Sequence, residues 1–397
     1  MPTQLKTISR SPTDPALVQD PYPFYDQMRA LGPIVRWEEY ALPCATSFAA
    51  VNAILRDRRF GREIPAAQRP PVPDHLRPFY AVEDHSMLEL EPPRHTRLRG
   101  LVMRAFTSRR IAALEPEIAA LTHELIDRFP EGPFDLLPRF AQPIPVIVIA
   151  RLLGVPEEMK DDLLAWSNAM VAMYMAGRTR AIEDAAAAAA RDFAAFLRDY
   201  IDQRRARPAD DLLTHLIAAE SDGDRLSTDE LITTCILLLN AGHEATVHSI
   251  GNGVKTLLEQ GYWAQAADPA MATPLTEEIL RFDPPLHLFT RIAYDDIEVA
   301  GHRFAPGDQV ACLLGAANRD PAHWDEPHVF DPQRVVKPHQ AFGAGLHFCV
   351  GAPLARLELT TALPILARRC PNLRLTAPPR YGDTYHFHGL AALQVQA

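Results

Sequence analysis

One ten-residue stretch, Phe342 to Gly351, constrains this chain more than any other part of it. It reads FGAGLHFCVG and places a single cysteine, Cys349, among three glycines. Glycine lacks a Cβ atom, so backbone amides can crowd around a large sulfur atom in conformations that other residues avoid. The residues from Ala352 onward predict a helix that tolerates Pro353 in its first turn. A cysteine at a helix N-terminus is favoured as the thiolate, which is the form that ligates haem iron.

This stretch resembles the haem-thiolate loop of the cytochrome P450 family, F-G-x-G-x-[HR]-x-C-x-G, and it matches all six fixed positions of the ten. A Gly-x-Gly pair beside one cysteine would by itself favour a glycine-rich turn, but the full match favours the ligand loop. The resemblance implies that Cys349 is the proximal thiolate of haem b, with Phe342, His347 and Gly351 against the cofactor. It also implies a mainly α-helical fold with a small β-region, formed by residues 1–397 as a single domain.

The rest of the sequence is typical of a globular protein without a membrane anchor. Apolar residues make up 47% and charged residues 23% of the 397 residues, an ordinary balance for a chain with a large core. We find no signal peptide and no run of the roughly 20 apolar residues that a membrane span requires. The five cysteines are scattered, which predicts neither disulfides nor a zinc site and indicates a cytoplasmic location. The net charge of −10 argues against nucleic-acid binding.

Two segments are candidates for covers over a binding pocket. The segment from Gly61 to Ser86 is rich in proline, and we expect a long loop that is either a surface connection or a substrate lid. In the resembled family this region covers the pocket, which favours the lid. The stretch from Leu164 to Met175 is apolar and rich in methionine; it is either core filling or part of a pocket roof.

A second motif turns from Pro92 and Pro93 into a predicted helix. His95 and Arg99 are four residues apart, so they share one helix face and suit a carboxylate ligand. Alone, such a pair is more often a solvated basic surface. The stretch resembles the family's P-P-x-H-x-x-x-R, however, which implies that both residues bind a haem propionate.

Arginines gather in and after this motif, and no acidic residue occurs between Pro92 and Leu114. The six are Arg94, Arg97, Arg99, Arg104, Arg109 and Arg110. On an acidic chain such a patch is either a solvated helix surface or a docking site for an acidic protein. In the resembled fold this helix borders the cysteine side of the haem, so the patch would steer an acidic electron donor such as a ferredoxin.

The longest strongly apolar helical stretch, residues 226–261, carries a third motif. Ser227 and Glu230 predict a capping box at its start. Its middle reads AGHEAT, residues 241–246, where small residues would let a flat ligand approach the backbone. An acidic residue in such apolar surroundings is costly unless it has a function, so Glu244 is a candidate catalytic group.

This sequence resembles the family's [AG]-G-x-[DE]-T-[ST], which implies that Ala241 lies against the haem and that Glu244 relays protons to dioxygen. The chain departs from the pattern because Ala245 replaces the usual threonine. Thr246 carries a hydroxyl, but one residue along a helix turns a side chain by about 100°, so it is no simple replacement. Ordered water or a hydroxyl on the substrate would complete the relay.

A fourth motif joins Glu278 and Arg281, three residues apart on a predicted helix, where they can form an ion pair. The spacing alone predicts no more than a surface pair. It resembles the family's E-x-x-R, with Arg334 in the place of a later arginine, which implies structural support beneath the haem.

The resemblance also implies a set of pocket residues. These are Pro285, Leu286, Leu288 and Phe387, with His243 from the long helix, while Arg291 would bind a propionate. The predicted pocket is apolar with scattered histidines, at positions 243, 287, 386 and 388. Such a lining is compatible with a terpenoid, a macrolide, a fatty acid or an aromatic molecule, and does not select among them.

Together, the matches extend from about Asp20 to Val395 and imply a bacterial monooxygenase that inserts one atom of O2 into an apolar organic small molecule. Electrons would come from a separate ferredoxin, of the [2Fe-2S] or another type, with its NAD(P)H-dependent reductase, since the chain has no flavin or cluster motif. A peroxide-driven oxygenase or a reductase is the second hypothesis, and the missing threonine favours it while Glu244 opposes it. A non-catalytic haem carrier and a cysteine hydrolase are the weaker alternatives.

Overall fold

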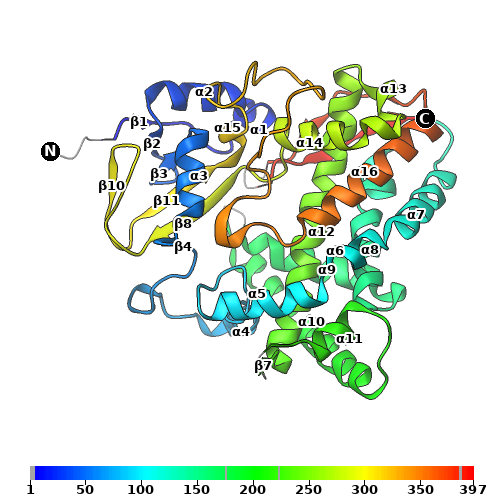
Figure 1. Cartoon of the computed structure of the whole chain (residues 1–397), viewed down its shortest axis with the longest axis horizontal. Coiled ribbons are helices and arrows are strands. Elements are labelled where there is room, and N and C mark those ends of the chain that lie inside the picture. The colour runs from blue at the N-terminus through cyan, green and yellow to red at the C-terminus, as the bar shows by residue number, and fades with distance from the viewer. Residues whose placement is uncertain (1–4, 175–176, 222–223, 384–386) are drawn as a thin grey trace.

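The computed structural model describes residues 5–174, 177–221, 224–383 and 387–397 (Figure 1). The α-helices are α1 (Pro15–Gln19), α2 (Tyr22–Leu31), α3 (Phe48–Arg56), α4 (Arg77–Glu83), α5 (Arg94–Ala105), α6 (Ser108–Ala112), α7 (Glu115–Asp127), α8 (Pro143–Leu153), α9 (Lys160–Val171), α10 (Arg180–Ala206), α11 (Leu212–Ala218), α12 (Thr228–Glu259), α13 (Trp263–Ala266), α14 (Ala272–Phe282), α15 (Leu314–Ala317) and α16 (Ala352–Arg369). The strands are β1 (Thr7–Ile8), β2 (Ile34–Trp37), β3 (Leu42–Ala45), β4 (Phe60–Gly61), β5 (Phe134–Asp135), β6 (Glu220–Ser221), β7 (Asp224–Arg225), β8 (Leu288–Ala293), β9 (Ile297–Val299), β10 (His302–Phe304), β11 (Gln309–Leu313), β12 (Arg374–Leu375), β13 (Arg380–Tyr381), β14 (Leu390–Ala392) and β15 (Gln394–Gln396). The prediction of a mainly α-helical protein with a small β-region is confirmed.

The main sheet lies at one side of the molecule, next to the N-terminal helices (Figure 1). Its strands follow the order β1-β2-β3-β11-β8-β4. The central strand β11 pairs parallel with β3 and antiparallel with β8, with Val310 opposite Arg291. Its residues Val310 to Leu313 are fully buried, as expected for a strand covered on both faces. The sheet therefore gives β8, which carries a predicted site residue, a rigid support.

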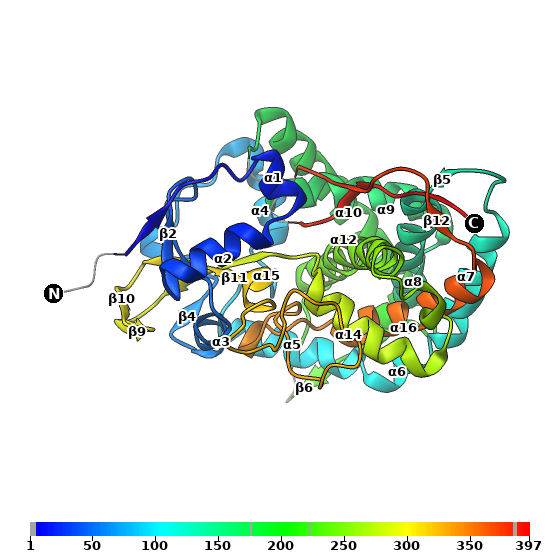
Figure 2. The same ribbon diagram turned by 90° about the horizontal axis from the view of Figure 1, so that it is seen from above.

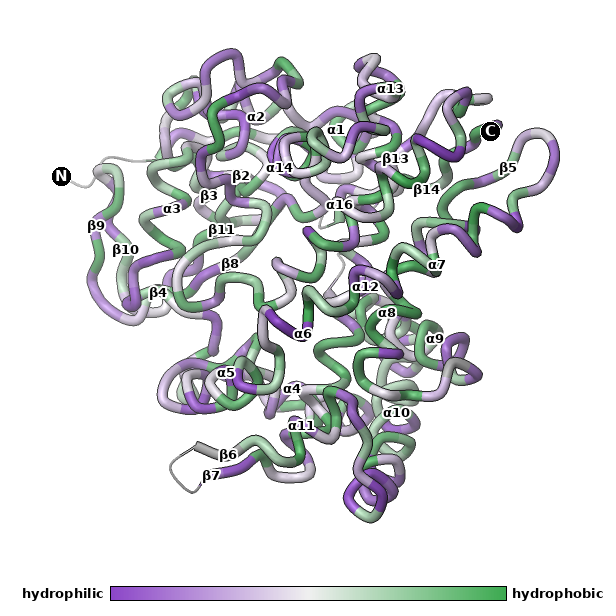
Figure 3. The backbone as a smooth tube through the Cα atoms, turned by 45° about the vertical axis from the view of Figure 1, so that its right-hand side comes forward, coloured by the Kyte–Doolittle hydropathy of each residue, from purple (hydrophilic) through white to green (hydrophobic). Residues whose placement is uncertain are grey.

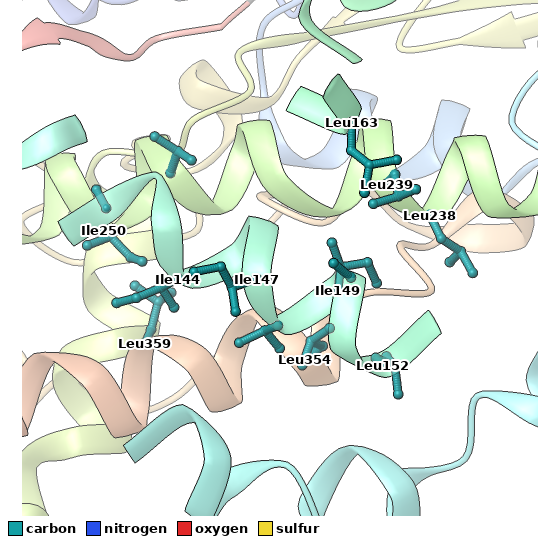
Figure 4. Close-up of a cluster of buried hydrophobic side chains, with 14 of the residues drawn as sticks. Ile144, Ile147, Ile149, Leu152, Leu163, Leu238, Leu239, Ile250, Leu354 and Leu359 are labelled. Atoms are coloured by element: carbon teal, nitrogen blue, oxygen red, sulfur yellow. The ribbon is translucent and has the colours of Figure 1, made fainter. Parts of the chain in front are cut away.

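The long helix α12 runs through the middle of the helical part, and Figure 2 shows the other helices arranged around it. Its capping box forms as predicted, since Ser227 Oγ accepts from the Glu230 amide at 3.2 Å and the Glu230 carboxylate accepts from the Ser227 amide at 2.8 Å. Side chains of α8, α12 and α16 interlock in one core, with Ile147, Leu239 and Leu354 among them (Figure 4). The helix α8 is largely hydrophobic (Figure 3), as a helix buried on all sides must be.

One sequence expectation about local structure was wrong. The segment 61–86 is not loop throughout, because its end forms α4, where Pro78 occupies the first turn and Phe79 and Val82 are buried. Pro364 lies inside the helix that follows Cys349, and α16 continues beyond it to Arg369. A proline removes only one backbone donor, and burial of the surrounding residues outweighs that loss.

The two ends of the described chain are held in the fold by strand pairing and side-chain contacts. β15 pairs with β5, and Asp135 accepts from the Leu393 amide at 2.9 Å. The Gln19 side chain both donates to and accepts from the backbone of Tyr381, at 3.0 and 2.9 Å. Across the described residues, no helix has the combined length and apolar character needed to cross a bilayer.

Candidate active site

The cysteine loop adopts a conformation that its glycines make possible. Gly343 and Gly345 have φ of 66° and 71°, a region that side chains other than glycine disfavour. A Cβ on Gly345 would lie 2.1 Å from the Leu55 carbonyl oxygen, so α3 packs directly against the loop. Cys349 donates its amide to the Phe342 carbonyl at 3.1 Å, and α16 begins three residues later. Cys349 is exposed, whereas the other four cysteines are buried.

The thiol of Cys349 does not have the lowered pKa that its position before a helix suggested. Desolvation by the surrounding protein raises the pKa, although hydrogen bonds from the backbone of Gly351 and Ala352 and the charges of Arg99 and Arg356 oppose this rise. The amides and guanidinium groups therefore favour the thiolate without fully offsetting the desolvation of the sulfur by the atoms around it. A metal ion bound at the sulfur would complete the deprotonation, because a coordinating thiol loses its proton.

Four residues predicted to bind a propionate come together beside the cysteine loop. The rings of His95 and His347 lie 4.4 Å apart, and Arg99 donates to the Phe348 carbonyl at 2.7 Å. Arg291, on β8, is 2% exposed, and its charge acts on His347. Burial, together with the charges of His347 and Arg99, lowers the pKa of His95 to about 4. Burial and the charge of Arg62 lower the pKa of Arg291 to about 10.

This group has an excess of positive charge and of unused donors, which two carboxylates would satisfy. Nδ1 of His95 and Nε of Arg62 are buried without a hydrogen-bond partner among the described residues. The acids nearby are Glu91, which lies 2.9 Å from Nε2 of His347, and Glu89, which pairs with Arg62 at 2.5 Å. Buried cations need anionic partners, so the residues fit the propionates of a haem. Sequence reasoning missed Arg62 and Glu91; the acid directly before the two prolines was the available signal.

The middle of α12 presents an open face within an otherwise buried helix. Leu237, Ala241, Glu244, Ala245 and His248 are all partly or fully exposed, while most of their neighbours on α12 are buried. These positions recur at helical spacing and therefore share one face. The small side chains of Ala241 and Ala245 leave room beside the helix, which agrees with the prediction that a flat ligand approaches there.

Glu244 is held between two histidines of its own helix. One carboxylate oxygen lies 3.3 Å from Nε2 of His243 and the other lies 3.3 Å from Nε2 of His248. Burial raises the pKa of Glu244, but the two histidine contacts outweigh it and the net shift is downward. His243 is 3% exposed and also lies 2.9 Å from the Leu239 carbonyl, a position that differs from the predicted pocket lining. The sequence analysis did not identify His248, although its spacing of four from Glu244 was the signal.

The E-x-x-R residues form a buried ion-pair network. Arg281 donates to both carboxylate oxygens of Glu278, at 2.7 and 2.6 Å, and to the carbonyls of Asn318, Pro327 and Val329. Arg334 lies 3.5 Å from the same carboxylate. The three predicted structural residues are thus in contact, and the bidentate geometry anchors the segment that precedes the cysteine loop.

The predicted pocket turns meet, but their histidines point elsewhere. An isolated bridge pairs Leu286 with Phe387, and the His388 amide donates to the Pro285 carbonyl at 2.8 Å. His287 is 0% exposed and its Nδ1 lies 2.8 Å from the Tyr25 hydroxyl, while His388 Nε2 lies 3.3 Å from Asp283. Both histidines therefore belong to a buried polar network behind the turns and not to a pocket wall.

Four further predictions about the pocket have different outcomes. Leu288 packs in the core cluster formed with α2 and the sheet, so the structure gives it no visible pocket role. Met170 and Met173 are buried core residues. His386 and Met175 lie outside the described residues. The segment 61–86 touches the predicted roof, because the Tyr174 hydroxyl donates to Glu83 at 2.7 Å.

The arginine-rich segment is less basic than its sequence suggests. Arg94 pairs with Glu63 at 2.5 Å, and Arg97 pairs with Glu230. Arg110 donates to the Ala105 carbonyl. Acids distant in sequence thus neutralise part of the patch, which the local absence of acidic residues could not reveal.

Comparison with known proteins identifies relatives of this arrangement. The cytochrome P450 family model matches residues 271–375. The chain is 36% identical to the putative cytochrome P450 YjiB of Bacillus subtilis over 359 residues, covering 89% of this chain and 88% of that protein. It is 37% identical to the cytochrome P450 monooxygenase PikC of Streptomyces venezuelae over 372 residues, covering 91% and 86%.

A solved structure extends the likeness to three dimensions. The structure of P450BioI in complex with an acyl carrier protein bearing hexadec-9Z-enoic acid superposes with a TM-score of 0.91 at 34% identity, covering 97% of this chain and 100% of that one. The likeness in sequence and in structure spans nearly the whole chain and includes the cysteine loop. The chain therefore belongs to the cytochrome P450 family, the monooxygenases that hold haem through a cysteine thiolate.

Proposed function

We propose that residues 1–397 form one monooxygenase domain that inserts an oxygen atom into an apolar organic small molecule, with electrons from a separate ferredoxin. The exposed Cys349 between the glycine loop and α16, beside a group of arginine and histidine side chains with unpaired buried donors at Nδ1 of His95 and Nε of Arg62, is the observation that carries this proposal. Bound haem supplies a redox-active iron at which dioxygen is reduced. The protein's own groups bind the cofactor, shape the pocket and hold protons.

Each predicted cofactor residue has a distinct task under this proposal. Cys349 supplies the sulfur ligand, and the backbone of Gly351 and Ala352 stabilises its negative charge. His95, Arg99, His347 and Arg291 hold the propionates, with Arg62 as an additional cation. The side chains of Phe342 and Ala241 are small or flat enough to border a planar ring.

The pocket favours an apolar guest. The predicted lining residues with apolar side chains are Pro285, Leu286, Leu288 and Phe387, whereas His287 and His388 are engaged in the buried network. Transfer of an apolar molecule into such a pocket is favourable by roughly 25 cal/mol per Å² of apolar surface removed from water. The relatives named above do not narrow the guest further.

Two exposed arginines support docking of an acidic electron donor. Arg104 and Arg109 are exposed on α5 and α6, near the segment whose Arg99 contacts the cysteine loop. Attraction between opposite charges raises association rates and weakens with salt. We expect charge reversal at Arg109, R109E, to slow electron transfer from a ferredoxin several-fold at low salt, with a smaller effect at 0.5 M salt, measured by stopped-flow reduction.

The second candidate function is peroxide-driven oxygenation. The observation that favours it is Ala245, whose methyl group cannot donate a proton where the family has a hydroxyl. Steady product formation with hydrogen peroxide alone, at a rate equal to that with donor proteins, would establish this alternative.

The first test is the absorption spectrum of the reduced protein under carbon monoxide. We expect the red-shifted Soret band typical of thiolate-ligated haem, and its loss in C349H with haem still bound. Substrate candidates are then screened by their effect on the spin state, and hits are assayed with ferredoxin, reductase and NADH. A wild-type protein that lacks the shifted band contradicts the proposal.

A further inference from the structure

The two hydroxyl groups closest in sequence to Ala245 are committed to the helix backbone. Thr246 Oγ1 donates to the Gly242 carbonyl at 3.2 Å, and Ser249 Oγ donates to the Ala245 carbonyl at 2.8 Å. Both residues are 4% exposed. Such bonds to the preceding turn are common for serine and threonine within helices. Neither hydroxyl therefore stands in for the missing threonine.

The group that does reach Glu244 on its open side is His248. The two side chains lie one helical turn apart, with Nε2 of His248 3.3 Å from the carboxylate. The side chain of His248 is 15% exposed, compared with 4% for His243 on the other carboxylate oxygen. Of these two histidines, His248 is thus the one with access to solvent.

The C-terminal turn has a shape that accommodates this ring. A Cβ on Gly389 would lie 1.9 Å from Nδ1 of His248, so only glycine leaves room for the imidazole. The ring of Phe387 lies 5.9 Å from that of His248. Nδ1 is buried with no hydrogen-bond partner among the described residues, and it is Nε2 that lies next to Glu244.

The neighbouring charges are few. Within α12, the titratable groups around His248 are Glu244 and, through it, His243. From the C-terminal turn, Phe387 and Gly389 face the ring and carry no charge, and the adjacent His388 contacts Asp283 instead. Among the residues that the structure describes, the anionic partner of His248 is therefore the Glu244 carboxylate.

We propose that His248 is a positioning residue for Glu244, which orients the carboxylate and stores the proton that the carboxylate passes to water in the pocket. This inference rests on the proposed monooxygenase function. In each transfer an N–H bond of His248 breaks and an O–H bond of Glu244 forms, the proton then moves to a pocket water, and solvent reprotonates His248. Hydroxylation consumes O2, two electrons from the donor and two protons, and yields the alcohol and one water.

The chain offers variants that separate orientation from proton storage. Glutamine in H248Q can place an amide donor near the position of Nε2 but does not titrate, whereas H248A removes both properties. S249A is the matched control, because it removes a hydroxyl from the same helix without touching Glu244. G389A tests whether the space beside Gly389 positions His248, since the added methyl group would displace the ring.

The first experiment needs no turnover. Histidine labelled with 13C is observed by NMR in the carbon monoxide complex of the reduced holoenzyme, and the His248 signal is assigned by its absence in H248Q. We expect E244Q to lower the midpoint pH of His248 by one unit or more, since the ring loses its anionic partner. An unchanged midpoint would show that the contact is absent in solution and would overturn the proposal.

The second experiment measures NADH-driven oxygen uptake between pH 6 and pH 9, with a [2Fe-2S] ferredoxin and its reductase. We expect wild type and S249A to slow as pH rises, and H248Q to be about tenfold slower at pH 6 and nearly independent of pH. H248A and G389A should be slower still. If H248Q keeps the wild-type pH profile, His248 stores no proton. Wild type that shows the thiolate spectrum but no donor-driven uptake contradicts the proposed function instead, while the NMR result stands separately.

Discussion

At the scale of single residues, burial and contact change the acidity of several side chains in ways that residue type does not indicate. Glu83 on α4 is half-buried and accepts from the Tyr174 hydroxyl. Burial is the main cause that raises the pKa of Glu83 to about 7, and the charge of Glu89 adds to it. This contact joins α4 to the turn after α9, the two segments expected to cover the pocket.

The free energy of unfolding should therefore decrease as pH rises, and part of this decrease should depend on Glu83. A neutral carboxyl with a raised pKa contributes stability that is fully present below about pH 4.5 and is lost as pH rises through about 7. We expect E83Q, which stays neutral, to flatten the decline in the free energy of unfolding between pH 5 and pH 8. Urea denaturation at each pH measures it. The exposed Glu131 provides the control, and E131Q should keep the wild-type slope.

The sequence predicts a site residue correctly when the interactions that define its role involve residues close to it in the chain. The pairing of Glu278 with Arg281 depends on helical spacing alone, and it was foreseen. The raised pKa of the Cys349 thiol was not, because its main cause is desolvation by the folded protein, which the neighbouring sequence does not reveal. His287 and His388 looked like pocket residues until the structure placed them with Asp283 and Tyr25.

At the scale of elements, the cysteine loop requires a close approach of its backbone to that of α3. Gly345 combines a positive φ with a position against the Leu55 carbonyl, whereas Gly132 has a φ of 86° and no atom within 4 Å of its hypothetical Cβ. A comparison of substitutions at the two glycines therefore distinguishes the cost of a left-handed backbone from the cost of a steric clash.

We expect G345A to reduce haem content and to destabilise the protein by more than the roughly 1–3 kcal/mol that a left-handed non-glycine residue costs. G132A should show the conformational cost alone and retain full haem content. The ratio of Soret to protein absorbance and the urea midpoint measure both effects. Equal losses in the two variants would contradict a steric role for the Leu55 contact.

Element boundaries were predictable where chemistry at the helix end specifies them. Ser227 and Glu230 mark the start of α12, as predicted. The helix α4 was missed because the prolines around it suggested a loop, although Pro78 fits the first helical turn. Pro364 lies inside α16, and the buried core around it keeps the helix continuous to Arg369.

At the scale of the whole molecule, the fold brings the beginning and the end of the chain together. Gln19 and Tyr381 are 362 residues apart and exchange two hydrogen bonds. No sequence pattern predicts the contact between Gln19 and Tyr381, because residues so far apart in the chain meet only in the completed fold. The two hydrogen bonds hold α1 against β13.

Loss of the contact between Gln19 and Tyr381 should destabilise both the N-terminal and the C-terminal part of the chain. We expect Q19A to lower the free energy of unfolding by about 1–2 kcal/mol, because two backbone groups lose their partner. Hydrogen exchange should rise in residues 380–382 and around 15–20 while α12 stays protected. Q19E, which keeps the acceptor but loses the donor, should fall between Q19A and wild type; exchange confined to one end would contradict a joint role.

The space that Gly389 leaves for His248 restricts how these two positions can change in evolution. A ring at one position and a missing side chain 141 positions later form a single steric unit, so mutations at the two sites are not independent. A lineage that replaced the glycine would have to give up the imidazole, and one that lost the imidazole would be released to accept a larger residue at 389. Among descendants of this sequence, the two positions should therefore covary.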